Sequence, residues 1–216
     1  GRIAAVRTGN VQQPVRLSLS DPDKKEFGLA GGSHAKNGIG LWAQGAFTRI
    51  ENSNVTTKFG GHIVTALMGI DKKFMNDRLL VGVSAGYEAM TLDTTFNRGN
   101  LDSDGILAVP YMSWKFDDVF SLAASAGGAW INYDMDRLDS SNNAKFTGST
   151  DANRYFGAAT LNADKRYNKV RVGGNLGVAY SHESRDAFTE RASGQTSVNV
   201  ASQDTHLGQA RLGGNV

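Results

Sequence analysis

The chain has 216 residues, and its 23 Lys and Arg against 21 Asp and Glu leave a net charge of +2, which gives no overall attraction to nucleic acid or acidic substrates. It has no cysteine, which excludes a disulfide framework and a thiolate metal site. No apolar run approaches the roughly 20 residues of a membrane-spanning helix, but a β-barrel remains compatible because half of each strand faces the lumen.

Residues 1–37 differ in character from the rest of the chain. The segment 3–6 is predicted to end a helix, and Ser20-Asp21-Pro22-Asp23 offers a helix cap or a turn. Gly31-Gly32-Ser33 predicts a break. We therefore interpret residues 1–37 as a linker or pore segment, partly helical or irregular, that precedes a β domain over residues 38–216.

The segment 79–91 shows the pattern of that domain most clearly. Leu79, Val81, Val83 and Tyr87 fall on one face of a strand, whereas Gly82, Ser84, Gly86 and Glu88 fall on the other. Similar segments recur and predict about eight strands, at 38–50, 59–71, 78–92, 103–116, 119–134, 154–166, 169–183 and 205–216.

Two of these strands leave a question open. The segments 59–71 and 103–116 are apolar on both faces, so their outward side is not predicted. Pro110 lies within the second of them and predicts a bulge or a locally unpaired position, since proline donates no ladder hydrogen bond.

The predicted connections alternate between short charged turns, at 71–78, 115–119 and 165–169, and long polar loops, at 51–58, 93–102, 137–153 and 183–204. Such an asymmetry is typical of outer-membrane barrels. Aromatic residues are expected to form belts at both ends of the strands. We assign to the long-loop belt Tyr87, Trp130, Tyr133, Tyr155 and Tyr180, and to the short-turn belt Phe116, Phe120 and Tyr167.

Several segments also resemble the autotransporter β-domain over about residues 38–216. They are Gly40-Leu41-Trp42-Ala43-Gln44-Gly45, Gly60-Gly61-His62, Leu67-Met68-Gly69-Ile70-Asp71, the segment 79–87, Tyr111-Met112-Ser113-Trp114-Lys115-Phe116 and Arg211-Leu212-Gly213. The resemblance implies an antiparallel up-and-down transmembrane β-barrel of twelve strands in the bacterial outer membrane. It also implies export of an N-terminal passenger, a linker helix crossing the pore, and the barrel-assembly machinery and periplasmic chaperones as partners.

The chain departs from this family in two respects. It supplies about eight strands instead of twelve, and it ends at Asn215-Val216 without the family's terminal aromatic residue. Two interpretations stay open: the domain is incomplete at its C-terminus, or this is a smaller closed barrel.

Polar and small residues on the non-lipid face are the predicted functional surface. Glycine and serine leave space there, and a charge inside a barrel must be paired or hydrated. The candidate lumen-facing binding residues are Gln44, Ser84, Glu88, Arg171, Asn175, Glu183, Gln209 and Arg211. This face either passes a threaded peptide and water or forms a polar network that plugs and stiffens the barrel.

Catalytic and metal sites are weighed against this interpretation and are not expected. Gly82-Val83-Ser84-Ala85-Gly86 matches the G-x-S-x-G nucleophile elbow, but the strand pattern runs through it without the required helix. Asp102-Ser103-Asp104-Gly105 lacks the later ligands of a calcium loop. His182 and His206 flank one long loop and are able to approach each other, yet solvated loop-edge histidines are the simpler interpretation.

The predicted function is therefore an outer-membrane translocator barrel without enzymatic activity or cofactor. Its expected partners are outer-membrane lipid and its own N-terminal passenger or linker, and nucleic acid is not expected. One alternative is a smaller outer-membrane barrel with rim hydrolase or adhesin activity, the hydrolase site being formed by His182, His206 and Asp204. The other is a soluble ligand-binding barrel.

Overall fold

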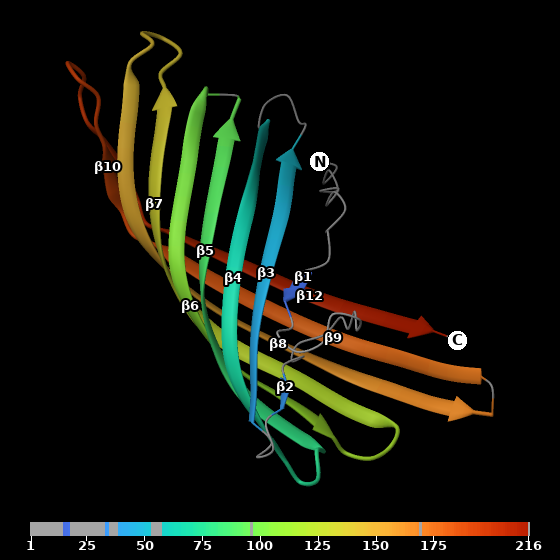
Figure 1. Cartoon of the computed structure of the whole chain (residues 1–216). Helices are drawn as coiled ribbons and strands as arrows, with labels where there is room; N and C mark the ends of the chain where they lie inside the picture. The colour runs from blue at the N-terminus through green and yellow to red at the C-terminus, as the bar shows by residue number, and fades with distance from the viewer. Residues whose placement is uncertain are drawn as a thin grey trace.

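The computed structural model describes residues 15–17, 33–34, 39–52, 58–95, 97–168 and 170–215. Eight long antiparallel strands form one strongly curved sheet (Figure 1). They are β3 (Ile39–Asn52), β4 (Phe59–Phe74), β5 (Leu79–Thr94), β6 (Gly99–Lys115), β7 (Phe120–Leu138), β8 (Lys145–Tyr167), β9 (Val170–Arg185) and β12 (Gln203–Asn215). The predicted all-β antiparallel fold and its eight strands are confirmed.

Consecutive long strands are neighbours throughout the sheet, in the order β3-β4-β5-β6-β7-β8-β9-β12. Such an up-and-down order needs only hairpin connections. Within the described residues the sheet is open, because β12 pairs with β9 on one side and with no described strand on the other.

Two short strands from the first 37 residues pair with β3, at the edge of the sheet opposite β12. β1 (Val15–Leu17) pairs with the segment 43–45 of β3, and β2 (Ser33–His34) pairs with Leu41 and Gly40. The helix predicted to end at 3–6 and the cap or turn at 20–23 lie outside the described residues.

The strands extend further at the long-loop end than the sequence predicts. β8 begins at Lys145 and β6 at Gly99, so connections expected at 137–153 and 93–102 shorten to 139–144 and 95–98. The turns at the opposite end, at 75–78, 116–119 and 168–169, agree with the prediction. At the long-loop end the strands therefore project further than expected, because they continue into polar sequence. The difference between the two ends of the sheet is thus partly a difference in how far the strands extend, and not only in the length of the loops.

The β9–β12 connection holds a hairpin that the sequence did not predict. β10 (Phe188–Glu190) pairs with β11 (Val198–Val200), and Gly194 in the connecting turn has φ of +71°. The hairpin is fixed to β8 by reciprocal backbone hydrogen bonds of 3.0 and 2.9 Å between Thr147 and Arg191. The buried Glu190 carboxylate accepts hydrogen bonds of 2.9 and 2.6 Å from Nε and Nη2 of Arg137.

We expect Glu190→Ala to release this hairpin. The substitution removes two charge-assisted hydrogen bonds from Arg137. Together these bonds stabilise the hairpin against β8, relative to a detached hairpin, by about 2 kcal/mol. Limited trypsin digestion of the folded protein should then cut at Arg191 about 10- to 30-fold faster, because cleavage follows the open population. Arg49 is the internal control site, because cleavage there should keep its original rate. Equal rates at Arg191 in both proteins would contradict the role given to Glu190.

The backbone conformation of the turn at 75–78 and the hydrogen bonds of the turn at 116–119 allow the chain to reverse direction within a few residues. Met75, Asn76 and Asp77 adopt positive φ values of 53°, 53° and 66°. Asp117 accepts backbone hydrogen bonds of 2.8 and 2.7 Å from Phe120 and Val119, and these bonds lower the pKa of its carboxyl group. The negative form of Asp117 thus caps the start of β7.

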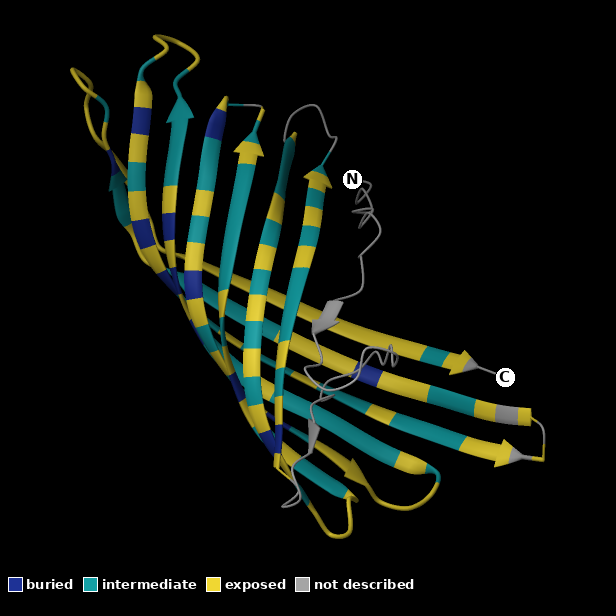
Figure 2. Ribbon diagram, viewed as in Figure 1, coloured by how far each residue is buried: buried dark blue, intermediate teal, exposed yellow. Residues whose placement is uncertain are grey.

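Exposed and covered residues alternate along most of β3, β4 and β6, whereas β12 is exposed along nearly its whole length (Figure 2). One face of the sheet carries large apolar side chains that are exposed, including Leu41, Met68, Val83, Ile106, Trp130, Tyr155, Val178 and Leu212. Even-numbered residues occupy this face in β4 and β6, which answers the question left open for 59–71 and 103–116. A continuous apolar face of this size is typical of a surface that contacts lipid or a partner.

Pro110 produces a locally unpaired position and not a bulge. The β6–β7 register pairs Ala108 with Gly128 and Tyr111 with Ser125, so equal numbers of residues intervene on the two strands. No pair is formed at Pro110 on that side, whereas it pairs with Val83 on the other. A missing N–H explains the gap without any change of register.

The described part of the chain contains no helix of the length and apolarity needed to span a membrane.

Candidate functional site: the polar inner face

Side chains from strands that are not neighbours touch on one face of the sheet. Arg154 of β8 contacts Glu88 of β5, although three strand spacings of about 4.8 Å separate these strands in a flat sheet. Only the concave side of a curved sheet brings such side chains together. We call this concave side the inner face, and the apolar face described above is the outer face.

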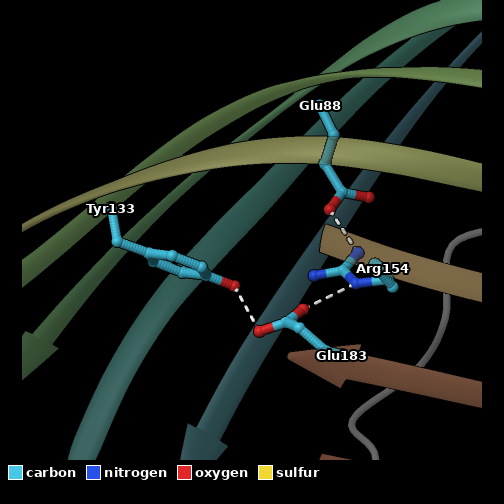
Figure 3. Close-up of polar contacts among 4 residues, drawn as sticks. All are labelled: Glu88, Tyr133, Arg154 and Glu183. Atoms are coloured by element: carbon cyan, nitrogen blue, oxygen red, sulfur yellow. Dashed lines mark hydrogen bonds and ion pairs between the residues drawn. The ribbon is translucent and has the colours of Figure 1, made fainter. Parts of the chain in front are cut away.

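Arg154 is the centre of a polar network on the inner face (Figure 3). Its Nη1 donates a hydrogen bond of 2.8 Å to Glu88 Oε1, and its Nε donates one of 2.7 Å to Glu183 Oε2. Tyr133 Oη donates to the other Glu183 oxygen at 2.9 Å. One guanidinium group therefore joins β5, β8 and β9, and Tyr133 adds β7 to the network through Glu183.

The three charged side chains of this network are only about a quarter exposed, at 27% for Arg154, 28% for Glu88 and 21% for Glu183. Two carboxylates against one guanidinium leave a formal charge of −1. The planar fork of arginine satisfies both carboxylates at once, which a lysine ammonium group does less well. The arrangement stiffens the inner face and leaves it slightly acidic.

Apolar side chains and small residues surround the network. A cavity of about 340 Å³ is lined by Glu88, Gly105, Leu107, Ala129, Ile131, Arg154, Phe156 and Ser181. The cavity has the size of one or two amino-acid side chains, and its mixed lining offers them both apolar contact and charge.

A second polar cluster lies on the inner face near the short-turn end. Trp42 Nε1 donates a hydrogen bond to Tyr111 Oη, which in turn donates one of 2.9 Å to Asp71 Oδ2. Asp71 is 3% exposed, and the Trp42 and Tyr111 rings meet edge to face with centroids 5.9 Å apart. The cluster connects β3, β4 and β6.

Glycines make room for the two rings of this cluster. A Cβ on Gly69 would approach the Trp42 indole to 2.5 Å, and one on Gly82 would overlap the Tyr111 ring. Glycine at these positions thus lets large side chains lie flat along the inner face. The glycines that flank Ser84 in the sequence therefore have a packing role on at least one side.

The structure places seven of the eight sequence-predicted binding residues on the inner face by strand register: Gln44, Ser84, Glu88, Asn175, Glu183, Gln209 and Arg211. The side chain of Arg171 lies outside the described set. Of the seven, only Glu88 and Glu183 are brought together, through Arg154. Ser84 is buried and donates a hydrogen bond of 3.2 Å to the Val109 carbonyl.

Sequence reasoning missed Arg154, Asp71 and Tyr111, and it misplaced Tyr133. Tyr133 was assigned to the long-loop aromatic belt, but it is 6% exposed and faces inward. The spacing in the sequence could have shown this. Tyr133 is three residues from Trp130, and side chains an odd number of residues apart lie on opposite faces of a strand. Trp130 is indeed outward and 57% exposed.

The hydrolase alternative gains no support from the observed geometry. Gly82-Val83-Ser84-Ala85-Gly86 lies wholly within β5, so the turn that a nucleophile elbow needs is absent there. His182 and His206 do meet on the outer face, with their Nδ1 atoms 3.2 Å apart. Asp204 pairs with Ser184 in the register, and the described contacts include no hydrogen bond between its carboxylate and either histidine.

The model of one known family, the autotransporter beta-domain, matches residues 41–216. This match covers most of the chain and, apart from the first two residues of β3, all eight long strands. No curated protein matches the chain.

Proposed function

Because the chain belongs to the autotransporter β-domain family, a family of outer-membrane translocator barrels, we propose that it anchors and helps to export an N-terminal passenger through a polar lumen. The observation that supports this proposal is the division of the sheet into two faces. The outer face presents large apolar side chains, and the inner face holds the charged Glu88–Arg154–Glu183 network.

In this proposal the inner face lines the pore and the outer face contacts lipid. An extended or helical peptide passes the inner face, where Gln44, Asn175, Gln209 and Arg211 offer polar side chains and glycines leave space. The network around Arg154 keeps the wall rigid while the peptide moves past it. Catalysis and a cofactor are not part of the proposed mechanism.

Residues 1–37 are proposed to remain as the pore segment after export. In the structure β1 and β2 pair with the edge strand β3, so two parts of this segment stay attached to the sheet. The barrel-assembly machinery and periplasmic chaperones are proposed partners for insertion into the outer membrane.

Deleting residues 1–37 should raise the conductance of the protein in a planar lipid bilayer. The physical reason is that the segment occupies part of the polar lumen and so excludes ions from it. The measurement compares single-channel currents of the protein with and without these residues in the same lipid and salt. Closed traces from both proteins would count against a peptide-conducting lumen.

A further inference from the structure

Two histidines on adjacent strands form a close pair on the outer face near the long-loop end. His182 of β9 and His206 of β12 are directly opposite in the register. Their Nδ1 atoms are 3.2 Å apart, and their rings stack with centroids separated by 4.5 Å. Tyr180 Oη lies 2.8 Å from the same Nδ1 of His206.

The distance between the two Nδ1 atoms is close to the distance between two imidazole nitrogens bound to one metal ion. Two imidazole nitrogens at about 2.0–2.1 Å from a tetrahedral Zn²⁺ are separated by about 3.3–3.4 Å. The observed 3.2 Å is close to that separation, so the strands need not move, and rotation of the two stacked rings about their side-chain torsions directs both Nδ1 lone pairs at one ion. Imidazole suits Zn²⁺, Ni²⁺ and Cu²⁺, whereas Mg²⁺ and Ca²⁺ prefer oxygen ligands.

We propose that His182 and His206 chelate a divalent transition-metal ion through their Nδ1 atoms, with the Tyr180 phenol beside the same position. Among the described residues no group of three His, Cys, Asp or Glu side chains is placed to hold a metal. Water therefore completes the coordination, and the ion exchanges readily. The metal joins β9 to β12 and acts as a clip across the last described pair of the sheet.

The pair lies near the long-loop end of β9, two residues beyond Tyr180 of the long-loop aromatic belt, and therefore at the edge of the lipid-facing band, where a dissolved ion has access. His206 is exposed and His182 is half-buried, and Tyr155, which is opposite His182 on β8, is 61% exposed. Asp204 shares the outer face of β12 two residues from His206, and its carboxylate adds negative charge near the site.

The test uses protein prepared without a histidine tag and solubilised in detergent. Zn²⁺ binding is measured by titration calorimetry, and Co²⁺ is used as a spectroscopic probe of the ligand set. The proposal expects saturable binding of about one Zn²⁺ with a Kd tighter than about 1 mM, and visible Co²⁺ absorption bands. Zn²⁺ should also raise the unfolding midpoint, because an ion that binds only the folded state stabilises it.

The variants separate this site from other histidines. His182→Gln and His206→Gln should each weaken Zn²⁺ binding at least ~10-fold and abolish the Co²⁺ bands, since each removes one of two direct ligands. His62→Gln is the matched control, because His62 stacks on Phe47 and lies on β4, which four strands separate from β9 in the sheet order, and it should leave binding unchanged. Binding that survives both pair variants, or no saturable binding below about 1 mM, overturns the proposal.

Discussion

Replacing Arg154 with methionine should lower the free energy of unfolding by about 2–3 kcal/mol. The change removes hydrogen bonds of 2.8 and 2.7 Å and leaves Glu88 and Glu183 facing each other without a cation. Loss of one partner from a fully buried ion pair costs about 3–5 kcal/mol, and the partial exposure of these side chains reduces that value. Tryptophan fluorescence during urea unfolding in detergent measures the effect.

Two further variants identify the cause of the destabilisation. Arg154→Lys should recover only part of the loss, because one ammonium group does not span both carboxylates with the geometry of a guanidinium. Glu88→Gln should lower the free energy of unfolding less in the Arg154→Met background than in the parent protein. Without Arg154, the charged Glu88 carboxylate faces Glu183 and already destabilises the fold.

Arg49→Met is the matched control for the loss of an arginine. Arg49 pairs with Glu51, but their side chains are 76% and 58% exposed, so the change should cost less than about 0.5 kcal/mol. Equal effects of Arg154→Met and Arg49→Met would show that the network contributes nothing beyond a surface ion pair.

Period-two alternation was sufficient to predict the strands, because one face of each is apolar and the other is small or polar. It predicted Glu88 and Glu183 on one face, but not that they meet. Their contact depends on Arg154 and on the curvature of the sheet, and curvature is a property of the whole assembly of strands. Sequence periodicity contains no information about contacts three strands apart.

The outer-face histidines show a similar limit. The sequence placed His182 and His206 at the two ends of one loop, and no metal site was expected from them. Their contact follows from the register of β9 with β12, which pairs the two residues directly. The loop between them contains its own hairpin, and loop sequence alone did not determine this register.

The second large effect is expected from Gly82→Ala, which should lower the free energy of unfolding by about 1–3 kcal/mol. The new Cβ would overlap the Tyr111 ring and lie 2.8 Å from Asp71 Cβ, so the ring must move away from Trp42 and Asp71. Urea unfolding gives the stability, and a changed emission from Trp42 reports the displaced ring.

The control for Gly82→Ala is another strand glycine with free space around it. A Cβ added to Gly208 of β12 would have no contact within 4 Å beyond its chain neighbours, so Gly208→Ala should be neutral or slightly stabilising. In a Tyr111→Leu background the cost of Gly82→Ala should fall, because the smaller side chain leaves room for the methyl group. An undiminished cost there would place the strain in the backbone of β5, and the proposed packing of Tyr111 over Gly82 would then be wrong.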